Sequence, residues 1–472
     1  MDFFMPTHAH LIGIGGIGMS GLAKLLQKSG VRVSGSDVAA SELTDALRKY
    51  SIDVKIGHDA ENIPEETDLI IYSSAVPETN PERAEARKRG IPQLTNFQFL
   101  GRWTETKHPI LVCGTHGKST TTALTGLLLI QGGIDPTVIV GSQVPDFKDG
   151  NIYFGTSDLV VIEGDEYAKH FLEFEPSAVI LNNIELDHTD VFPDLESLIR
   201  AFRELLLKVR HGGLVVANAD DARVQTLIGE ERGRLESRQI KIKTFGFGSH
   251  ADLQIADCLP KPQGQTFALR DETGLLTRYS LHIPGRMNVM NAVAAMTLAQ
   301  YLGVSPQAIR ETFDRFKGIW RRFEIVLDRG QVTVVSDYGH HPTAVAATLD
   351  AAHSFFPGRR IVLCFQPHHH NRTKQLFADF IPSFDKADAL LLTEIYDVAG
   401  RDAAEDQNVS SRDLQEAVLH RDEERGIKRL VEYASDPKEA LNLLKRWRKP
   451  NDVVIVMGAG DIYKIAVHVL DA

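Results

Sequence analysis

The chain of 472 residues has only three cysteines, and no apolar run in it is long enough to cross a membrane. Cys113, Cys258 and Cys364 lie far apart within apolar runs, which argues against disulfides and against a cysteine-rich zinc site. A membrane-spanning helix needs ~18 to 20 apolar residues in a row. The first residues, MDFFMPTHAH, also lack the basic and apolar regions of a secretory signal. We therefore expect a cytoplasmic protein.

Positively charged residues are outnumbered by negatively charged ones. The chain has 52 Lys and Arg against 63 Asp and Glu, so its formal net charge is −11. This balance argues against binding to nucleic acid or to an anionic membrane. Anionic substrates would then be held by local groups such as helix N-termini, metal ions and single basic residues. The sequence leaves a monomer and a homodimer both open.

Short apolar segments alternate with amphipathic ones along most of the chain, which predicts parallel sheets with helical crossovers. The chain is too long for one core, so several domains are expected. We predict three α/β domains: a Rossmann-like domain at 1–106, a P-loop-type ATPase domain at 107–319 and a second Rossmann-like domain at 320–472.

Three further segments have distinct patterns. Residues 250–285 alternate apolar and polar side chains, which predicts a few antiparallel strands. Residues 287–302 are typical of a helix that ends at Gly303. Pro342 is expected in the first turn of another helix, where its missing N–H costs nothing.

A glycine-rich turn, Gly13-Ile-Gly15-Gly16-Ile-Gly18, follows the first predicted strand, and Asp37 ends the next strand. In this context the turn resembles a dinucleotide-binding loop, whose glycines let a diphosphate approach the helix N-terminus. The turn alone does not distinguish NAD from a nucleotide-sugar diphosphate.

The stretch ILVCGTHGKSTTTAL (110–124) predicts a second phosphate site. A strand, a glycine-rich turn and a helix present successive N–H groups to an anion. Lys118 would add a positive charge, and Ser119 or Thr120 a hydroxyl for Mg²⁺. The strict P-loop pattern requires glycine where Val112 stands, which argues against an ordinary P-loop ATPase but not against phosphate binding.

Acidic residues end the next two predicted strands. Glu163 is the first candidate ligand for Mg²⁺, and Asp165 and Glu166 are candidates for positioning substrate, although a solvated acidic turn is the plain alternative. His188, after Asp187, is a candidate ligand for a second cation. Two cations would allow a carboxylate to approach a γ-phosphate.

Asparagine and arginine side chains add two more candidates. Asn288 and Asn291 share one face of their helix, where an amide suits the adenine edge or packs against another helix. Arg321 and Arg322 lie at a predicted domain junction, where one guanidinium could reach a transferring phosphoryl group. The alternative is that the two arginines are only part of a charged surface.

Histidines gather at two strand ends of the third domain, in DYGHHPT and PHHHNRT. They lack both cysteine and the His-Glu-x-x-His spacing, which argues against zinc. Arg372, beside them, would suit a carboxylate.

Taken in order, the motifs GIGGIGMSG, GTHGKSTTT, EGDE, NNIELDH, MNVMNAVAA, GIWRRFE, SDYGHHPT, FQPHHHNRT and MGAGDI resemble those of the Mur ligases over the whole chain. Within that family they are most similar to the members that join L-alanine to UDP-N-acetylmuramate in peptidoglycan precursor synthesis. The resemblance implies an ATP-dependent, ADP-forming ligase that activates the muramoyl carboxylate as an acyl phosphate. Its substrates would be UDP-N-acetylmuramate, L-alanine and ATP, with Mg²⁺ as cofactor.

The resemblance also implies site residues. Those for ATP are Gly114, Thr115, Gly117, Lys118, Ser119, Thr120, Asn291, Arg322, Asp337 and His340. Those for the UDP-sugar are Gly15, Gly16, Gly18, Asp37, Ser73, Ser74, His116 and Glu166. Those for the amino acid are Tyr338, His368 and Arg372, and those for the metal are Ser119, Glu163 and His188. Lys118, His188 and Arg322 would be catalytic.

The chain departs from the family pattern at several positions. Ser119 replaces threonine, Met287 replaces histidine, Gly164 and Tyr167 replace alanine and serine in the acidic motif, and His369 stands where arginine is usual. The nearest alternative is the ligase that adds a recycled tripeptide to UDP-N-acetylmuramate. An NAD-dependent oxidoreductase and a non-enzymatic ATP-gated binding protein are the alternatives from other classes.

Overall fold

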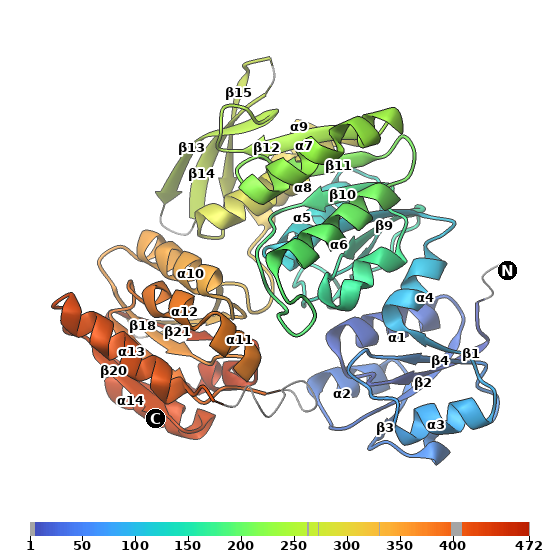
Figure 1. The fold of residues 1–472 in the computed structure, drawn as a ribbon, viewed down its shortest axis with the longest axis horizontal. Helices are drawn as coiled ribbons and strands as arrows, with labels where there is room; N and C mark the ends of the chain where they lie inside the picture. Colours follow the sequence, from blue (N-terminus) through green and yellow to red (C-terminus); the bar gives the residue numbers. More distant parts are fainter. Residues whose placement is uncertain (1–4, 262–263, 272, 330, 398–407, 472) are drawn as a thin grey trace.

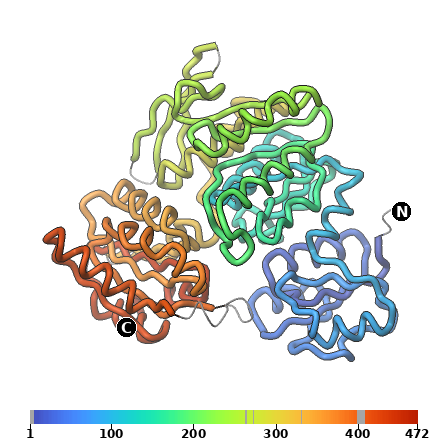
Figure 2. The backbone as a smooth tube through the Cα atoms, viewed as in Figure 1, coloured from blue at the N-terminus to red at the C-terminus, as the bar shows by residue number. Residues whose placement is uncertain are grey.

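The protein is described by a computed structural model that covers residues 5–261, 264–271, 273–329, 331–397 and 408–471. Residues 1–4, the first part of the segment MDFFMPTHAH on which the absence of a secretory signal was predicted, lie outside the described residues. The described chain forms three α/β domains, each with its own sheet (Figure 1). Figure 2 shows the domains following one another along the chain, with the N-terminus on the first and the C-terminus on the third. No described helix is long and apolar enough to cross a membrane.

The N-terminal domain has five parallel strands in the order β3-β2-β1-β4-β5. Its elements are β1 (His8–Ile12), α1 (Ile17–Lys28), β2 (Arg32–Asp37), α2 (Glu42–Lys49), β3 (Asp53–Ile56), η1 (Ala60–Asn62), β4 (Leu69–Tyr72), α3 (Pro81–Lys88), β5 (Gln93–Thr95) and α4 (Asn96–Trp103). Strand order changes direction between β1 and β4, so the loops after these two strands lie side by side and form the expected ligand site of such a sheet.

The central domain has ten strands in the order β15-β14-β13-β12-β11-β10-β6-β9-β7-β8. Its elements are β6 (His108–Cys113), α5 (Lys118–Gln131), β7 (Thr137–Ile139), β8 (Ile152–Tyr153), β9 (Leu159–Glu163), η2 (Tyr167–Glu173), β10 (Ala178–Leu181), α6 (Leu195–Lys208), β11 (Leu214–Asn218), α7 (Ala222–Ser237), β12 (Lys241–Gly246), β13 (Leu253–Lys261), β14 (Gly264–Arg270), β15 (Leu276–Leu281), α8 (Arg286–Tyr301) and α9 (Pro306–Arg315). The prediction of antiparallel strands in 250–285 is confirmed by β13, β14 and β15. The predicted helix at 287–302 is α8, and Gly303 follows it with φ +87°.

The C-terminal domain has six strands in the order β16-β17-β21-β18-β19-β20. Its elements are β16 (Glu324–Arg329), β17 (Val332–Asp337), α10 (Pro342–Phe355), β18 (Arg360–Phe365), α11 (His370–Gln375), α12 (Phe377–Ser383), β19 (Ala389–Thr393), α13 (Ser411–Glu424), β20 (Leu430–Ala434), α14 (Pro437–Trp447), β21 (Asp452–Met457) and η4 (Ile462–His468). Pro342 is the first residue of α10, as predicted. The edge strands β16 and β20 were not predicted, and β16 is antiparallel to β17.

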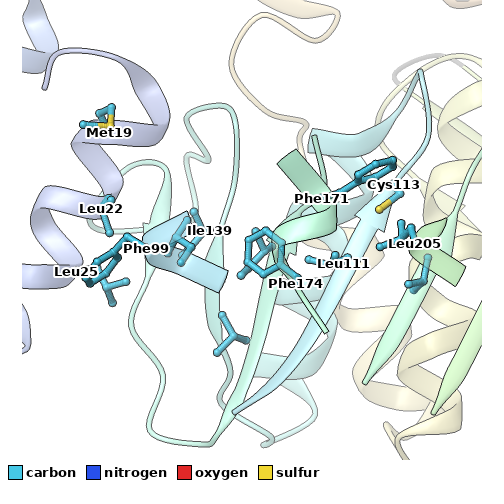
Figure 3. Packing of buried hydrophobic residues seen from close by; sticks show 14 of the residues in the cluster. Met19, Leu22, Leu25, Phe99, Leu111, Cys113, Ile139, Phe171, Phe174 and Leu205 are labelled. Atoms are coloured by element: carbon cyan, nitrogen blue, oxygen red, sulfur yellow. The ribbon is translucent and has the colours of Figure 1, made fainter. Parts of the chain in front are cut away.

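One hydrophobic cluster joins the N-terminal and central domains. In Figure 3, Leu22 and Leu25 of α1 lie beside Phe99 of α4, and Ile139 and Phe174 of the central domain continue the same cluster. The described residues of the C-terminal domain form two clusters, one on each face of the sheet, and Met287 of α8 packs against one of them. The first two domains therefore share one apolar cluster, whereas the third meets the central domain through Met287 and through the polar contacts described below.

A buried polar cluster lies within the N-terminal domain. The fully buried Glu82 carboxylate accepts hydrogen bonds from Ser36 (2.7 Å) and Asn62 (3.0 Å), and it lies 2.9 Å from Nε2 of His10 and 3.1 Å from Nδ1 of His58. Burial alone would raise its pKa, but the hydrogen bonds from His10, Ser36 and Asn62 lower the pKa of Glu82 to about 2. The carboxylate therefore stays ionised and ties β1, β2 and α3 together.

Candidate active site

A tight loop between β6 and α5 carries the predicted phosphate-binding residues. Gly114 and Gly117 have φ of +126° and +81°, in the left-handed region that favours glycine. A Cβ on Gly117 would lie 2.2 Å from Oδ1 of Asn291 on α8, so the loop packs closely against that helix. Because α5 begins at Lys118, the N–H groups of its first turn have no partner within the helix. The loop has the form of an anion site although Val112 replaces a glycine.

Lys118 is held in place by the loop itself. Its Nζ donates to the carbonyl oxygens of Gly114 (2.8 Å) and Thr115 (3.2 Å) and to Oε1 of Glu166 (2.8 Å). Burial works against the charge, but Glu166 and the nearby carboxylates raise the pKa of Lys118 above its ordinary value. The lysine is therefore a fixed positive charge, paired with a carboxylate.

Oxygen ligands meet beside this lysine. Oγ of Ser119 donates to Oε1 of Glu163 (2.9 Å), whose Oε2 accepts the N–H of Gly141 (2.7 Å). From the C-terminal domain, Nη2 of Arg322 donates to the same Ser119 oxygen at 3.4 Å. A hydroxyl and a carboxylate are ligands that Mg²⁺ prefers, so this pair fits a magnesium ion next to a phosphate.

His188 belongs to a neighbouring group. Its Nε2 lies 3.7 Å from Oε1 of Glu166. The rings of Tyr167 and His188 meet edge to face, with 5.1 Å between their centroids. The backbone of His188 is left-handed, with φ +54°, which marks a strained position. The second oxygen of Glu166, Oε2, is buried and has no hydrogen-bond partner among the described residues. Of the predicted metal ligands, Ser119 and Glu163 are thus paired, whereas His188 lies beside Glu166, a residue predicted to bind the UDP-sugar.

In the N-terminal domain, the glycine-rich turn lies against Asp37. The N–H of Gly15 donates to Oδ2 of Asp37 (2.8 Å), and a Cβ on Gly15 would lie 2.9 Å from that oxygen. Gly16 precedes α1 and Gly18 lies in its first turn. After β4, Ser73 lies next to Gly13, so the structure brings the two predicted loops together at the change in strand order.

The two predicted asparagines contact one another. Nδ2 of Asn291 donates to Oδ1 of Asn288 (3.2 Å), and Nδ2 of Asn288 donates to the carbonyl of Pro284 (2.7 Å). Asn291 also lies directly over Gly117. The asparagine pair therefore borders the phosphate loop.

The arginines at the junction have separate surroundings. The guanidinium of Arg321 is buried and donates to the carbonyl oxygens of Gly458 and Gly460 in its own domain. Arg322 instead reaches Ser119 of the central domain. The carboxylate of Asp337 accepts the N–H groups of Phe323 and Gly339, and burial raises its pKa.

A cavity of about 120 Å³ lies between the central and C-terminal domains. It contains all three predicted amino-acid-binding residues, and its lining is His188, Thr189, Asp190, Tyr338, His340, His368, His369, Asn371, Arg372 and Ala459. His340, which the resemblance assigned to the nucleotide, therefore lies on this cavity. Burial lowers its pKa to about 3, so the ring is neutral.

Arg372 reaches back from this cavity to the central domain. Its Nε donates to Oδ1 of Asp187 (2.8 Å), and its Nη1 lies 3.1 Å from Nδ1 of His368. Burial opposes the charge of Asp187, but Arg372, His188 and His340 hold the pKa of this carboxyl well below its ordinary value.

Glu185 forms a second bridge between these domains. Its carboxylate lies 2.9 Å from Nε2 of His116 and accepts the hydroxyl of Thr343 at 2.7 Å. His116, Glu185 and His341 are the one group of described side chains whose ligand atoms, all within 4.8 Å, could hold a metal ion. The carboxylate already has two partners, and His341 caps α10, so these contacts are explained by domain contact alone.

Sequence reasoning missed Glu185 and His170. His170 lies on η2, with its Nε2 2.9 Å from Oγ of Ser74 and its Nδ1 3.0 Å from Oδ2 of Asp165. Glu185 follows a buried strand, which was a usable signal, whereas His170 lies in an unremarkable segment.

The departure from the family pattern at Gly164 is explained by the structure, since a Cβ there would lie 2.4 Å from Sγ of Cys113.

Family models match almost the whole chain. They are described as the Mur ligase family catalytic domain (residues 8–108), the Mur ligase middle domain (112–299) and the Mur ligase glutamate ligase domain (321–460).

Individual relatives agree with these matches. The chain is 39% identical to the UDP-N-acetylmuramate–L-alanine ligase of Solibacter usitatus, over 99% of this chain and 96% of the relative. It is 38% identical to the enzyme of the same name from Salinibacter ruber, over 96% of this chain and 92% of the relative. The solved UDP-N-acetylmuramate-alanine ligase of Thermotoga maritima matches with a TM-score of 0.81 at 27% identity, over 98% of both chains. A murein peptide ligase of Psychrobacter arcticus shares the fold, with a TM-score of 0.71 at 22% identity over 98% of both chains. The resemblance seen in the motifs is confirmed: the chain belongs to the Mur ligase family.

Proposed function

We propose that the protein joins L-alanine to the carboxylate of UDP-N-acetylmuramate, with conversion of ATP to ADP and phosphate, in peptidoglycan precursor synthesis. The observation that carries the proposal is the meeting of two domains at the phosphate loop, where Ser119, the residue after Lys118, accepts a hydrogen bond from Arg322 of the third domain. Relatives named UDP-N-acetylmuramate–L-alanine ligase match nearly the full chain, which supports the same reaction here.

The reaction has two steps. The carboxylate attacks the γ-phosphoryl group of ATP to give an acyl phosphate and ADP, which turns a poor leaving group into a good one. The amine of L-alanine then attacks the carbonyl carbon, and phosphate leaves. In this proposal the loop N–H groups and Lys118 hold the phosphates, and Arg322 stabilises the charge on the transferring group. The contribution of the protein is therefore positioning and charge neutralisation.

Ser119, Glu163 and His188 would hold magnesium, which when bound neutralises charge between the carboxylate and the phosphate. The oxygen donors Ser119 and Glu163 support this assignment, as does the buried oxygen of Glu166 beside His188, which has no hydrogen-bond partner in the part of the chain that the structure describes.

The other assignments also remain proposals. The UDP-sugar is placed over the loops after β1 and β4, the adenine near Asn291, and the amino acid near Tyr338, His368 and Arg372. The position of His340 supports a role beside the amino acid. The domain limits at 106/107 and 319/320 stay predictions. Dependence on ATP and three free cysteines support a cytoplasmic location.

The tripeptide-adding activity is the second candidate, because a murein peptide ligase has the same fold. The relatives at 38 and 39% identity, which are named UDP-N-acetylmuramate–L-alanine ligase, favour L-alanine over a tripeptide. Membership of the Mur ligase family removes the support for an NAD-dependent oxidoreductase, which would leave the lysine loop without a use.

Release of phosphate from ATP tests the proposal. The purified protein is incubated with UDP-N-acetylmuramate, ATP and Mg²⁺, and each amino acid or the tripeptide is added in turn. Phosphate release that requires L-alanine is the expected result. Release that requires the tripeptide would establish the second candidate instead, and release with no acceptor would contradict both.

A further inference from the structure

Ser74, His170 and Asp165 form a hydrogen-bonded chain across the junction of the first two domains. Oγ of Ser74, after β4, lies 2.9 Å from Nε2 of His170, and Nδ1 of the same ring lies 3.0 Å from Oδ2 of Asp165. Ser74 is exposed and His170 is 8% exposed, so the chain runs from the surface of the proposed UDP-sugar site into the central domain.

The imidazole of His170 is fixed in orientation as well as in position. The ring of Phe97, from α4 of the N-terminal domain, stacks on it with centroids 4.2 Å apart and 13° between the planes. The preceding residues Ala168 and Lys169 have φ of +48° and +60°, an unfavourable left-handed turn for side chains other than glycine. Strain of this kind persists where the surrounding contacts require it, and here it delivers His170 to Ser74.

Asp165 decides which nitrogen carries the proton. A carboxylate only accepts hydrogen bonds, so Nδ1 of His170 is the donor to Asp165. In the neutral ring Nε2 then has a free lone pair and accepts the hydroxyl proton of Ser74. Because the hydroxyl proton of Ser74 is donated to Nε2, the Ser74 oxygen can only accept further hydrogen bonds. A ligand at Ser74 has to donate a hydrogen bond, which a diphosphate cannot do.

From this geometry we propose that His170 is a positioning residue that makes Ser74 an acceptor for the sugar part of the UDP-sugar. The group received is an N–H or O–H donor, namely the acetamido N–H or a ring hydroxyl, and not a phosphate oxygen. This inference rests on the proposed function, because it takes UDP-N-acetylmuramate as the ligand of this site.

Equilibrium binding without ATP or amino acid tests the inference, with UDP and UDP-N-acetylmuramate as the two ligands. Ser74→Ala and His170→Ala should bind UDP-N-acetylmuramate ~3- to 10-fold more weakly, the loss expected for one hydrogen bond. Both variants should bind UDP as the wild type does. A merely structural contact between domains would not separate the two ligands.

Two further variants keep the test sharp if His170→Ala folds poorly. His170→Gln should restore binding, since its amide oxygen can occupy the place of Nε2 and accept from Ser74. Asp165→Asn should bind UDP-N-acetylmuramate as weakly as His170→Ala, because an amide donor at Nδ1 moves the ring proton to Nε2 and reverses the role of Ser74.

Equal weakening for UDP and UDP-N-acetylmuramate would overturn the inference, and so would wild-type binding by Asp165→Asn. Wild-type protein that binds neither ligand would overturn the proposed function as well. Because no turnover is needed, protein that binds both ligands but forms no product would contradict the proposed reaction alone.

Discussion

Arg372 and Asp187 come from different domains and form a buried ion pair, with 2.8 Å between Nε and Oδ1. Arg372 also lines the cavity that is proposed to bind the amino acid. Arg372, which is expected to bind the carboxylate of the amino acid, is thus oriented by Asp187 of the central domain. Domain contact and amino-acid binding depend on the same guanidinium.

Asp187→Asn should therefore weaken amino-acid use more than ATP use. Removal of one partner from a buried pair costs roughly 3 to 5 kcal/mol, so we expect KM for L-alanine to rise at least ~10-fold while KM for ATP changes little. Steady-state kinetics of phosphate release measure both. Asp385→Asn is the matched control, because Asp385 pairs with Arg421 in a more exposed setting away from the cavity. Equal changes in the two KM values would contradict the assignment.

Lys118→Ala should lower ADP formation by at least ~10²- to 10³-fold, the usual cost of removing one group that stabilises transferring charge. Binding of the UDP-sugar should stay nearly intact, because six of its eight proposed residues, Gly15, Gly16, Gly18, Asp37, Ser73 and Ser74, lie on the N-terminal domain. Coupled-enzyme detection of ADP and a separate UDP-sugar binding assay make the comparison. Loss of both together would contradict the division of labour between the domains.

Gly117→Ala should weaken ATP binding for two separable reasons. Alanine is strained at φ +81°, and its Cβ would lie 2.2 Å from Oδ1 of Asn291. Left-handed strain costs roughly 1 to 2 kcal/mol, and the overlap adds to it, so a loss of at least ~10-fold in ATP affinity is expected. In a double-mutant cycle with Asn291→Ala, the second change should relieve the overlap but not the strain. Strictly additive effects on ATP affinity would show that the two residues do not meet.

Acid should destabilise the N-terminal domain through Glu82. Its folded pKa of about 2 is below the ordinary 4.5, so its stabilisation is complete above pH 4.5 and is lost as the pH falls towards 2. Glu82→Gln should lower the stability at pH 7 by about 1 to 3 kcal/mol, and it should flatten the pH dependence below 4.5. Thermal unfolding at pH 7, 4.5 and 3 measures this. Glu85→Gln, in an exposed pair with Lys88 on the same helix, should behave as the wild type at each pH.

The sheets and phosphate loop were predictable because local patterns determine them. Buried strands such as β6 are continuous apolar runs, and the glycines of the loop mark positions that need positive φ. β16 was missed because its residues are mostly half-exposed and it pairs only along one edge. The position of Glu185 after a buried strand was a usable signal, but its contact with Thr343, like that of His170 with Ser74, joins two domains. Such contacts depend on how domains meet, which no local pattern encodes.

Lys118 is paired with the buried carboxylate of Glu166, with 2.8 Å between Nζ and Oε1. A triphosphate that enters the loop has to displace, or share the lysine with, an anion that the protein already supplies. Nucleotide binding is in this respect an exchange, and its net electrostatic gain is smaller than the attraction between a free lysine and a phosphate. The same internal counter-ion raises the pKa of Lys118 and fixes the position of its ammonium group, so the site has a permanent, oriented positive charge.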